Sequence, residues 1–170
     1  FNNFKMANKK YDLIIIGGGP AGIAAGIYAS RAKIKTLMIA KGFGGQMTRK
    51  TVSIENYPGF KSISGTDLVA KFVEHLKEYD VKIVNDSTGV VKKNSGFFSV
   101  KTASEGWFDA TAVIVASGAD PRPLEITGEK EFIGRGGSYC TACDAPIFAD
   151  KIVAIVGGGK TASVSAIAGQ

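Results

Sequence analysis

The apolar residues near the start of the chain form two short runs separated by a stretch of small residues. Tyr11–Ile16 is a mostly apolar run that ends at glycines, which is typical of a buried parallel strand. Alanine and glycine recur from Ala21 to Ala32, which suits a helix packed close to a sheet. Lys35–Ala40 predicts the next strand. Together these segments predict one β-α-β unit of about 30 residues, the size that nucleotide-binding folds use.

The next segment is a long loop followed by an amphipathic helix. Residues 41–65 are rich in glycine and proline, and a loop of this length inside a compact domain is usually functional or disordered. Helical spacing follows over Asp67–Tyr79, with Ser64 or Thr66 as the N-cap. The apolar positions of this helix predict one buried face: Leu68, Val69, Phe72, Val73 and Leu76. Val81–Val84 predicts a third parallel strand.

Shorter apolar pieces occupy the middle of the chain. Those separated by turns predict a small antiparallel meander: Val90-Val91, Phe97–Thr102 and Trp107–Ala110. Ala112–Ala116 predicts a further strand that ends at Ser117-Gly118. Residues 120–137 are irregular and contain two prolines, which indicates a connector. Lys151–Val156 predicts another strand, followed by a second glycine turn and the start of a helix.

The chain contains an internal repeat. Residues 12–21 align with residues 152–161, since each is an apolar strand that runs into three consecutive glycines. Two such starts in one chain predict two nucleotide-binding domains, which we place at residues 1–118 and 119–170. The sequence given ends at Gln170, after one strand and about two turns of helix, and a lone β-α piece cannot bury its own apolar face.

The first glycine turn has the spacing of a dinucleotide-binding motif. Gly17, Gly19 and Gly22 fit the pattern G-x-G-x-x-G between a predicted strand and a predicted helix. The first glycine permits the tight turn, the second lets the backbone approach a pyrophosphate, and the third allows close packing of helix on strand. An acidic residue usually follows the second strand and binds the ribose. Here Ala40 and Lys41 stand there, so backbone groups would hold the ribose, or Lys41 would contact phosphate.

The second glycine turn fits the same pattern at Gly157, Gly159 and Ala162, since alanine is accepted in the last position. Lys160 adds a positive charge inside this turn. That charge is equally compatible with a phosphate-bearing nucleotide and with a lysine that faces solvent.

Composition narrows the class of protein. The chain has 170 residues, of which 45% are apolar and 21% charged, so it can bury a core. Its formal charge of +6 is scattered and not clustered with aromatic residues, which argues against a nucleic-acid partner. No apolar run reaches the roughly 18 residues of a membrane span. The first ten residues are polar and basic without a hydrophobic signal core, so we expect a cytoplasmic protein and no membrane association.

The two cysteines of the chain, Cys140 and Cys143, form a C-x-x-C pair directly before Asp144. In a cytosolic chain this spacing is typical of a redox pair with one activated thiolate. Zinc is the competing interpretation, but a structural zinc site needs four ligands, so a partner chain would have to supply some of them. Asp144 is a candidate acid/base for thiol exchange, or alternatively a helix N-cap or turn residue.

These motifs together resemble one family, the low-molecular-weight thioredoxin reductases and the related flavoprotein component of alkyl hydroperoxide reductase. The matching stretches run in the family's order along nearly the whole chain: GGGPAG (17–22), GFGGQM (42–47), IENYPGF (54–60), ASGADPRPL (116–124), GRGGSYCTACDAPIF (134–148) and VAIVGGGKTASVSA (153–166). The resemblance is most specific at the dithiol, which lies just before the second glycine turn.

The resemblance implies an α/β fold in which a Rossmann-like FAD-binding domain, with a parallel sheet and a small antiparallel meander, precedes the start of a Rossmann-like NAD(P)H-binding domain. It also implies that electrons pass from NADPH to FAD, then to the Cys140–Cys143 disulfide, and then to a thioredoxin-like or peroxiredoxin-type disulfide protein. Cys143 would lie nearer the flavin, and Asp144 would be the acid/base. The full-length form would be a homodimer.

The resemblance further implies the cofactor contacts. The FAD contacts would be Gly17, Gly18, Gly19, Pro20, Ala21, Gly22, Gly44, Gly45, Gln46, Asn56, Ser117 and Gly118. Lys41 joins these candidates from its place after the second predicted strand, and not from the resemblance. The NADPH contacts would be Gly157, Gly159, Lys160, Thr161 and Ala162.

The chain departs from the family after the second glycine turn. Ser163–Ser165 stand where the family usually has acidic residues, and the basic cluster for the NADPH 2′-phosphate and the flavin-binding return segment are not in the sequence. We therefore expect a fragment that is inactive alone. The alternative is a non-catalytic flavin- or nucleotide-binding module that works with another polypeptide.

Overall fold

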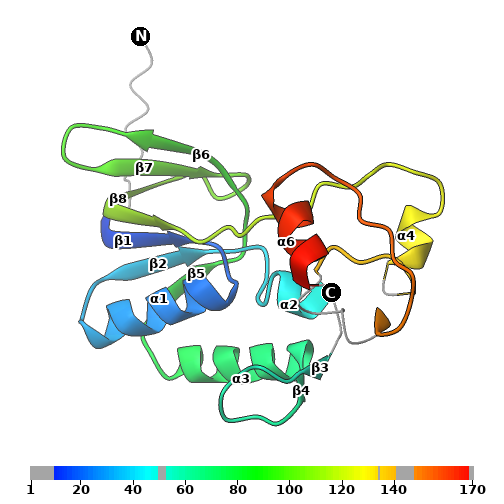
Figure 1. Cartoon of the computed structure of the whole chain (residues 1–170). Helices are drawn as coiled ribbons and strands as arrows, with labels where there is room; N and C mark the ends of the chain where they lie inside the picture. The colour runs from blue at the N-terminus through cyan, green and yellow to red at the C-terminus, as the bar shows by residue number, and fades with distance from the viewer. Residues whose placement is uncertain (1–9, 50–52, 134, 141–147, 169–170) are drawn as a thin grey trace. The chain divides into compact units, whose positions relative to one another are not determined.

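The computed structural model describes residues 10–49, 53–133, 135–140 and 148–168 (Figure 1). The chain divides into two compact units, Phe1–Ala119 and Asp120–Gln170. Each unit is described by itself below.

Unit 1 is built on a six-stranded sheet with strand order β5-β2-β1-β8-β7-β6. The strands are β1 (Lys10–Ile16), β2 (Thr36–Ile39), β5 (Lys82–Val84), β6 (Thr88–Lys93), β7 (Phe98–Thr102) and β8 (Trp107–Val115). The first four in this order are parallel, whereas β8, β7 and β6 are antiparallel neighbours. The predicted α/β class, with three parallel strands in the first half and a meander after them, is confirmed. Because the four parallel strands run the same way, their carboxyl ends meet at one edge of the sheet.

Strand β8 differs from the prediction of two separate pieces. Its first half pairs with β7, from Trp107 to Ala110, and the strand pairs with β1 from Asp109 to Val115. No turn-forming residue interrupts it, because the intervening Thr111 is β-branched and suits a strand. The meander is therefore an extension of the parallel sheet, and β8 brings its carboxyl end beside that of β1.

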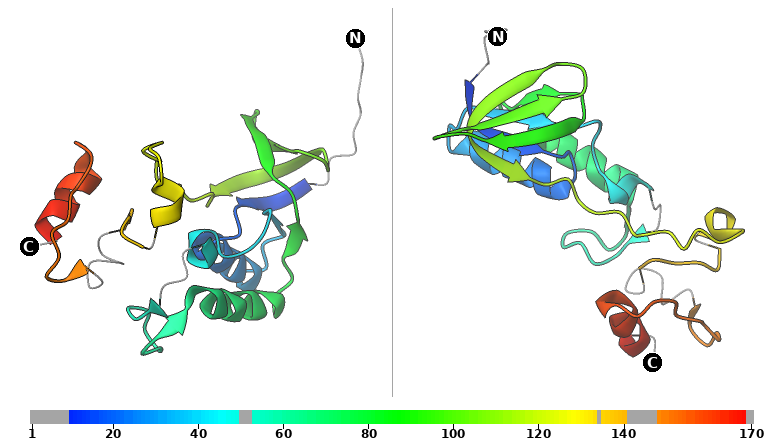
Figure 2. Two further views of the ribbon diagram at one scale, coloured as in Figure 1. Left: turned by 90° about the vertical axis from the view of Figure 1, so that its right-hand side faces the viewer. Right: turned by 90° about the horizontal axis from the view of Figure 1, so that it is seen from above.

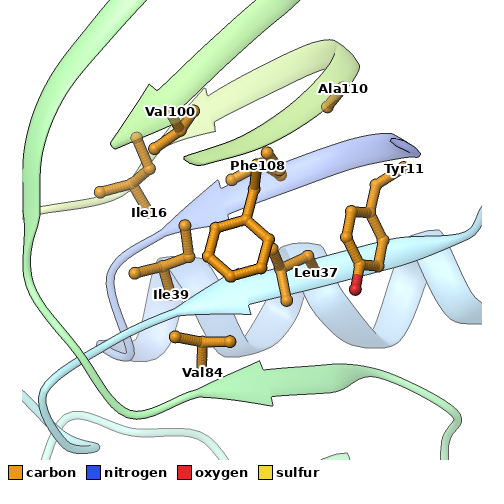
Figure 3. Close-up of a cluster of buried hydrophobic side chains, with 9 residues drawn as sticks. Tyr11, Ile16, Leu37, Ile39, Val84, Val100, Phe108 and Ala110 are labelled. Atoms are coloured by element: carbon orange, nitrogen blue, oxygen red, sulfur yellow. The ribbon is translucent and has the colours of Figure 1, made fainter. Parts of the chain in front are cut away.

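Alternate residues of the central strands supply two cores on opposite faces of the sheet. On one face, Ile15 and Met38 pack with Ile23 of α1 (Pro20–Arg31) and Leu76 of α3 (Gly65–Lys77). Both helices lie on this same face (Figures 1 and 2). The other core is shown in Figure 3 and consists of Tyr11, Ile14, Ile16, Leu37, Ile39, Val84, Val100, Phe108 and Ala110. The central strands are thus packed on both faces of the sheet.

The segment between β2 and α3 has more structure than the loop predicted for it. It contains α2 (Gln46–Arg49) and a two-stranded antiparallel sheet of β3 (Ser53–Ile54) and β4 (Ile63–Ser64). These elements are too short to show a periodicity in the sequence. The predicted cap at Ser64 is confirmed, because its hydroxyl accepts from the Asp67 backbone N–H at 3.0 Å. Helix α3 consequently begins at Gly65, two residues before the predicted start.

Unit 2 contains α4 (Glu129–Phe132) and α6 (Lys160–Ala168). The prediction of a helix after the second glycine turn is confirmed by α6. The predicted strand at residues 151–156 is wrong, since that run has no strand structure and Ile152 and Val156 are exposed. A strand exists only beside another strand that completes its hydrogen bonds, and the described part of unit 2 contains none. Across all described residues, no helix has the length and apolarity to cross a membrane.

Candidate functional site: the loops at the carboxyl edge of the sheet

The first glycine turn leaves β1 between the ends of two neighbouring strands. The Gly17 N–H donates to the carbonyl of Ile39 at 2.9 Å, and Gly17 has a φ of +115°. A Cβ at this position would lie 2.2 Å from the carbonyl oxygen of Ala116, which follows β8. Only glycine therefore fits here, both for its backbone conformation and for the space available.

The third glycine of the motif sets the distance between α1 and the turn. A Cβ on Gly22 would lie 2.0 Å from the carbonyl oxygen of Gly17. The helix begins with the Ile23 N–H donating to the Gly19 carbonyl at 3.0 Å. Helix α1 therefore starts directly on the turn, as the motif requires.

The second glycine of the motif faces open space. A Cβ on Gly19 would have no atom within 4 Å, unlike one on Gly17 or Gly22. Gly19 is the N-cap of α1, with no side-chain cap and no acidic residue in the first turn of the helix. Pro20 and Ala21 are exposed beside it. The first N–H groups of α1 are thus left for an anion, and the helix dipole favours one there. The residues present fit a pyrophosphate.

The loop after β2 packs on the glycine turn. The Gly44 N–H donates to the Gly18 carbonyl at 2.9 Å, and a Cβ on Gly18 would lie 2.4 Å from the Gly42 carbonyl oxygen. Gly44 has a φ of +99°, and a Cβ there would lie 2.4 Å from the Thr48 side chain. A Cβ on Gly45 would lie 3.9 Å from the Gly19 Cα. The predicted residues Gly44 and Gly45 are therefore brought to the same place as the first turn.

A third loop joins them from β8. The Ala116 N–H donates to the Ile16 carbonyl at 2.8 Å, so Ser117 and Gly118 follow beside the glycine turn. The amide of Gln46 donates to the carbonyl of Ala119, which ties the loop after β2 to the loop after β8. Ligands of open α/β sheets bind where the strand order reverses at the carboxyl edge, and β1 beside β8 is such a point here.

Two other predicted contacts remain to be placed. Lys41 is exposed at the end of β2. Asn56 is exposed between β3 and β4, and within the described residues no hydrogen bond joins it to the three loops. The structure thus brings together the contacts that follow strands β1, β2 and β8, but it does not link Asn56 to them.

The polar pair Asn85-Asp86 also belongs to this edge and was missed from the sequence. Two carbonyls face the Asn85 side-chain amide, so its nitrogen is the group that points at them, 3.0 Å from Lys41 O and 3.2 Å from Ala40 O. Asp86 accepts from the backbone N–H groups of Ser87, Ser104 and Glu105 and from the Ser104 hydroxyl.

These donors, the Ser104 backbone N–H first, hold the pKa of Asp86 well below its usual range. The sequence signal that could have identified this pair is that two polar residues directly follow β5, the third strand predicted to be parallel.

One cavity of unit 1 lies away from these loops. It has a volume of about 1110 Å³ and lies where β2 begins and where α1 and α3 end, with Arg31, Lys35 and Tyr79 in its wall. The candidate site is thus an open cluster of loops, placed by the motif geometry and not by cavity size.

The second glycine turn, in unit 2, repeats the local geometry of the first. Gly157 has a φ of +132°, and a Cβ there would lie 3.4 Å from the Ala162 Cβ. The Ser163 N–H donates to the Gly159 carbonyl at 3.1 Å, as Ile23 does to Gly19 in the first turn. Lys160 and Thr161 are exposed at the start of α6.

Of the predicted redox residues, the structure describes one. Cys140 is half-buried, and its backbone N–H donates to the Ser138 hydroxyl at 3.0 Å. Cys143 and Asp144 lie outside the described residues. In the described part of the chain, no group of three histidine, cysteine, aspartate or glutamate residues is placed to hold a metal ion.

Known proteins match this chain along nearly all of its length. Residues 11–169 match the pyridine nucleotide-disulphide oxidoreductase family. The chain is 44% identical over 154 residues to thioredoxin reductase of Bacillus subtilis, covering 91% of this chain and 48% of that protein. It is 40% identical over 164 residues to a component of the alkyl hydroperoxide reductase of Pseudomonas putida, covering 95% of this chain and 31% of that protein.

Solved structures show the same likeness. The crystal structure of thioredoxin reductase from Streptococcus pyogenes superposes with a TM-score of 0.83 at 39% identity, covering 95% of this chain and 52% of that one. A ferredoxin-flavin thioredoxin reductase from Clostridium acetobutylicum superposes with a TM-score of 0.62 at 35% identity, covering 82% of this chain and 48% of that one. The chain thus spans about half the length of the thioredoxin reductases it matches.

Proposed function

Because the chain belongs to the pyridine nucleotide-disulphide oxidoreductase family, we propose that it forms part of a flavin-dependent disulfide reductase of the thioredoxin reductase type. Electrons would pass from NADPH through FAD and the Cys140–Cys143 pair to a protein disulfide. The observation that carries the proposal is the open space beside Gly19, at the start of α1, where no side chain caps the helix. At Gly17 and Gly22 a Cβ would instead collide with backbone atoms.

The three converging loops are the FAD-binding part of the proposal, within a domain of residues 1–118. The backbone N–H groups at the start of α1 would hold the pyrophosphate, because they carry partial positive charge and have no side-chain cap. The proposed FAD contacts are Gly17, Gly18, Gly19, Pro20, Ala21, Gly22, Lys41, Gly44, Gly45, Gln46, Asn56, Ser117 and Gly118. The glycines let the cofactor come against the main chain, where any side chain would stand between them.

The second turn is the NADPH-binding part, within a domain of residues 119–170. The start of α6 would hold the NADPH pyrophosphate in the same way as α1 holds that of FAD, with contacts from Gly157, Gly159, Thr161 and Ala162. Lys160 is exposed in this turn and would add a positive charge toward the phosphates.

The cysteine pair would carry out the exchange with the partner. Bound FAD supplies the relay of two electrons from NADPH to the Cys140–Cys143 disulfide. In the reduced pair, the Cys140 thiolate attacks one sulfur of the partner disulfide, and the other sulfur leaves as a thiolate that takes a proton from Asp144. The Cys143 thiolate then attacks Cys140 in the mixed disulfide, which re-forms the Cys140–Cys143 bond and releases the second partner thiolate. The partner gains two electrons, and the pair loses two.

The names of the relatives support two kinds of partner. A thioredoxin-type protein is the first, since the Bacillus subtilis relative is a thioredoxin reductase. A peroxiredoxin-type protein is our second candidate, since the Pseudomonas putida relative is a component of an alkyl hydroperoxide reductase. We place the reaction in the cytoplasm, where a C-x-x-C pair is kept in redox exchange, and we propose that the full-length form is a homodimer.

The test uses a chimera in which this chain replaces the matching half of Bacillus subtilis thioredoxin reductase. The chimera should bind FAD and oxidise NADPH when thioredoxin disulfide is present. Cys140→Ser should abolish thioredoxin reduction while FAD remains bound. A chimera that folds and binds FAD but reduces neither thioredoxin nor a peroxiredoxin would overturn the enzyme proposal and favour a non-catalytic flavin-binding module.

A further inference from the structure

The end of β2 lacks the group that usually binds a ribose in this kind of site. A carboxylate at that place accepts hydrogen bonds from the ribose hydroxyls of a bound dinucleotide. Ala40 has no polar side chain, and Lys41 has only donors. The site therefore needs an acceptor from elsewhere on the same edge of the sheet.

Asn85 lies directly beside this gap. Strand β5 pairs with β2 in parallel register, with Val84 opposite Ile39, so Asn85 follows its strand at the same level as Ala40. Its side-chain nitrogen donates to the carbonyls of Ala40 and Lys41. Both hydrogen bonds of this amide, among the described residues, are made by the nitrogen. The side-chain oxygen Oδ1 is left as an acceptor on an exposed residue.

The backbone around Asn85 holds the amide in this position. The Val84 carbonyl accepts from the N–H of Ala40 at 3.0 Å and from the N–H of Asp86 at 3.0 Å, which closes a tight turn centred on Asn85. The carboxylate of Asp86 is in turn fixed by N–H groups of the turn between β7 and β8, at Ser104 and Glu105. The amide of Asn85 is thus pinned on both sides, by its own nitrogen and by the next residue of the chain.

The segment after β2 also contacts the first glycine turn. Ala40 is followed by Lys41 and Gly42, and a Cβ on Gly18 would touch both the Ala40 Cβ, at 3.0 Å, and the Gly42 carbonyl oxygen, at 2.4 Å. The segment that Asn85 holds is therefore in contact with the turn proposed for the pyrophosphate. The adenosine ribose is bonded directly to that pyrophosphate, so it would lie close to this segment.

From this placement we infer that Asn85 is the ribose-binding residue of the first nucleotide site, with its Oδ1 accepting a hydrogen bond from a hydroxyl of the adenosine ribose. The inference rests on the proposed function, since it assumes that the first glycine turn binds an adenine dinucleotide. It gives the residue that follows β5 the role that a carboxylate at the end of β2 usually has.

The test measures whether Asn85 and one ribose hydroxyl depend on each other. FAD is titrated into the 170-residue chain by its fluorescence, and the bound FAD is then displaced with ADP, 2′-deoxy-ADP or 3′-deoxy-ADP. Displacement of FAD reports on the first site alone, whatever the second glycine turn binds. Asn85→Ala should weaken ADP by about three- to tenfold, the usual effect of one neutral hydrogen bond. It should leave unchanged the affinity for whichever deoxy nucleotide lacks the bonded hydroxyl.

Two variants accompany this measurement. Asn94→Ala removes an amide of the same kind, whose nitrogen donates to the Ser99 hydroxyl at 2.9 Å near the β6–β7 turn, and should change none of the three affinities. Asn85→Gln keeps both the amide nitrogen that donates to the carbonyls and the acceptor oxygen, and should keep the preference for ADP over that deoxy nucleotide. It also tests the inference if Asn85→Ala does not fold.

The outcomes separate the two levels of the argument. If the 170-residue chain binds neither FAD nor ADP, the same titrations are made on the chimera; if the chimera also binds neither, the proposed function fails and the inference falls with it. If FAD binds but Asn85→Ala weakens ADP and both deoxy nucleotides equally, Asn85 only positions the backbone and the inference alone is overturned. The same holds if Asn85→Ala changes no affinity, or if Asn85→Gln binds ADP and that deoxy nucleotide equally.

Discussion

Adding one methyl group to the first glycine turn should have different effects at its two glycines Gly22 and Gly19. Gly22→Ala places a Cβ 2.0 Å from the carbonyl oxygen of Gly17, where ordinary contact begins at 3.4 Å. Gly19→Ala places a Cβ where no atom lies within 4 Å. Gly19 has φ −76° and ψ 179°, which any residue adopts without strain. The first substitution should therefore act on folding and the second on binding.

The magnitude for Gly22→Ala follows from what must move. Helix α1 has to shift by about 1.4 Å, the difference between those two distances, away from the turn. That shift disturbs the packing of Ile23, which is 2% exposed. It also disturbs the close contact at Gly26, where a Cβ would lie only 3.1 Å from side-chain atoms of Met38 and Leu76. Overpacking of this kind costs about 3 kcal/mol, which corresponds to a fall in Tm of about 10 °C for a unit of this size.

For Gly19→Ala the free energy of unfolding should change by less than about 1 kcal/mol, because the weaker N-cap preference of alanine is offset by the lower entropy of the unfolded chain. The affinity for FAD should fall at least about tenfold, since the methyl group occupies the approach to the first N–H groups of α1. The assay is thermal unfolding by circular dichroism together with FAD fluorescence titration on both variants. A Gly19→Ala chain that binds FAD as tightly as the unsubstituted chain, or a Gly22→Ala chain with an unchanged Tm, would refute this reasoning.

Two further predictions concern stability in unit 1. Since its backbone donors lower the pKa of Asp86 in the folded state, the charged carboxylate stabilises the fold at pH values above its unfolded pKa of about 3.9, and this stabilisation is lost as the pH falls below that value. Asp86→Asn should therefore lower the urea midpoint at pH 7 and make less difference at pH 3; an equal loss at both pH values would show that the charge is not what matters. Ser64→Ala should destabilise α3 by about 1 kcal/mol, because it removes the N-cap, whereas Thr66→Ala, which removes no cap, should change urea unfolding by less than half of that. Equal effects of the two substitutions would contradict the assignment of the cap.

Periodicity and motif spacing predicted the elements whose stability is local or whose partners are nearby in the sequence. The apolar runs of β1 and β2, the small residues of α1 and the helical face of α3 each carry their own pattern, and Ser64 carries its capping chemistry. The predicted strand at residues 151–156 is as rich in apolar residues as β1, but it has no neighbouring strand in the described part of unit 2. Composition alone therefore did not decide strand structure, because a strand needs the hydrogen-bond partners that only the rest of a sheet provides.

The sequence by itself determined that two glycine turns follow apolar runs and that two cysteines lie between them, since these depend on spacing along the chain. Only the tertiary structure decided that β8 is one continuous strand beside β1, and that the loops after β1, β2 and β8 meet there. It also placed Asn85 against the gap left by Ala40 and Lys41. The physical reason is that a parallel sheet brings together the ends of strands that are far apart in sequence. No local pattern records which strands become neighbours.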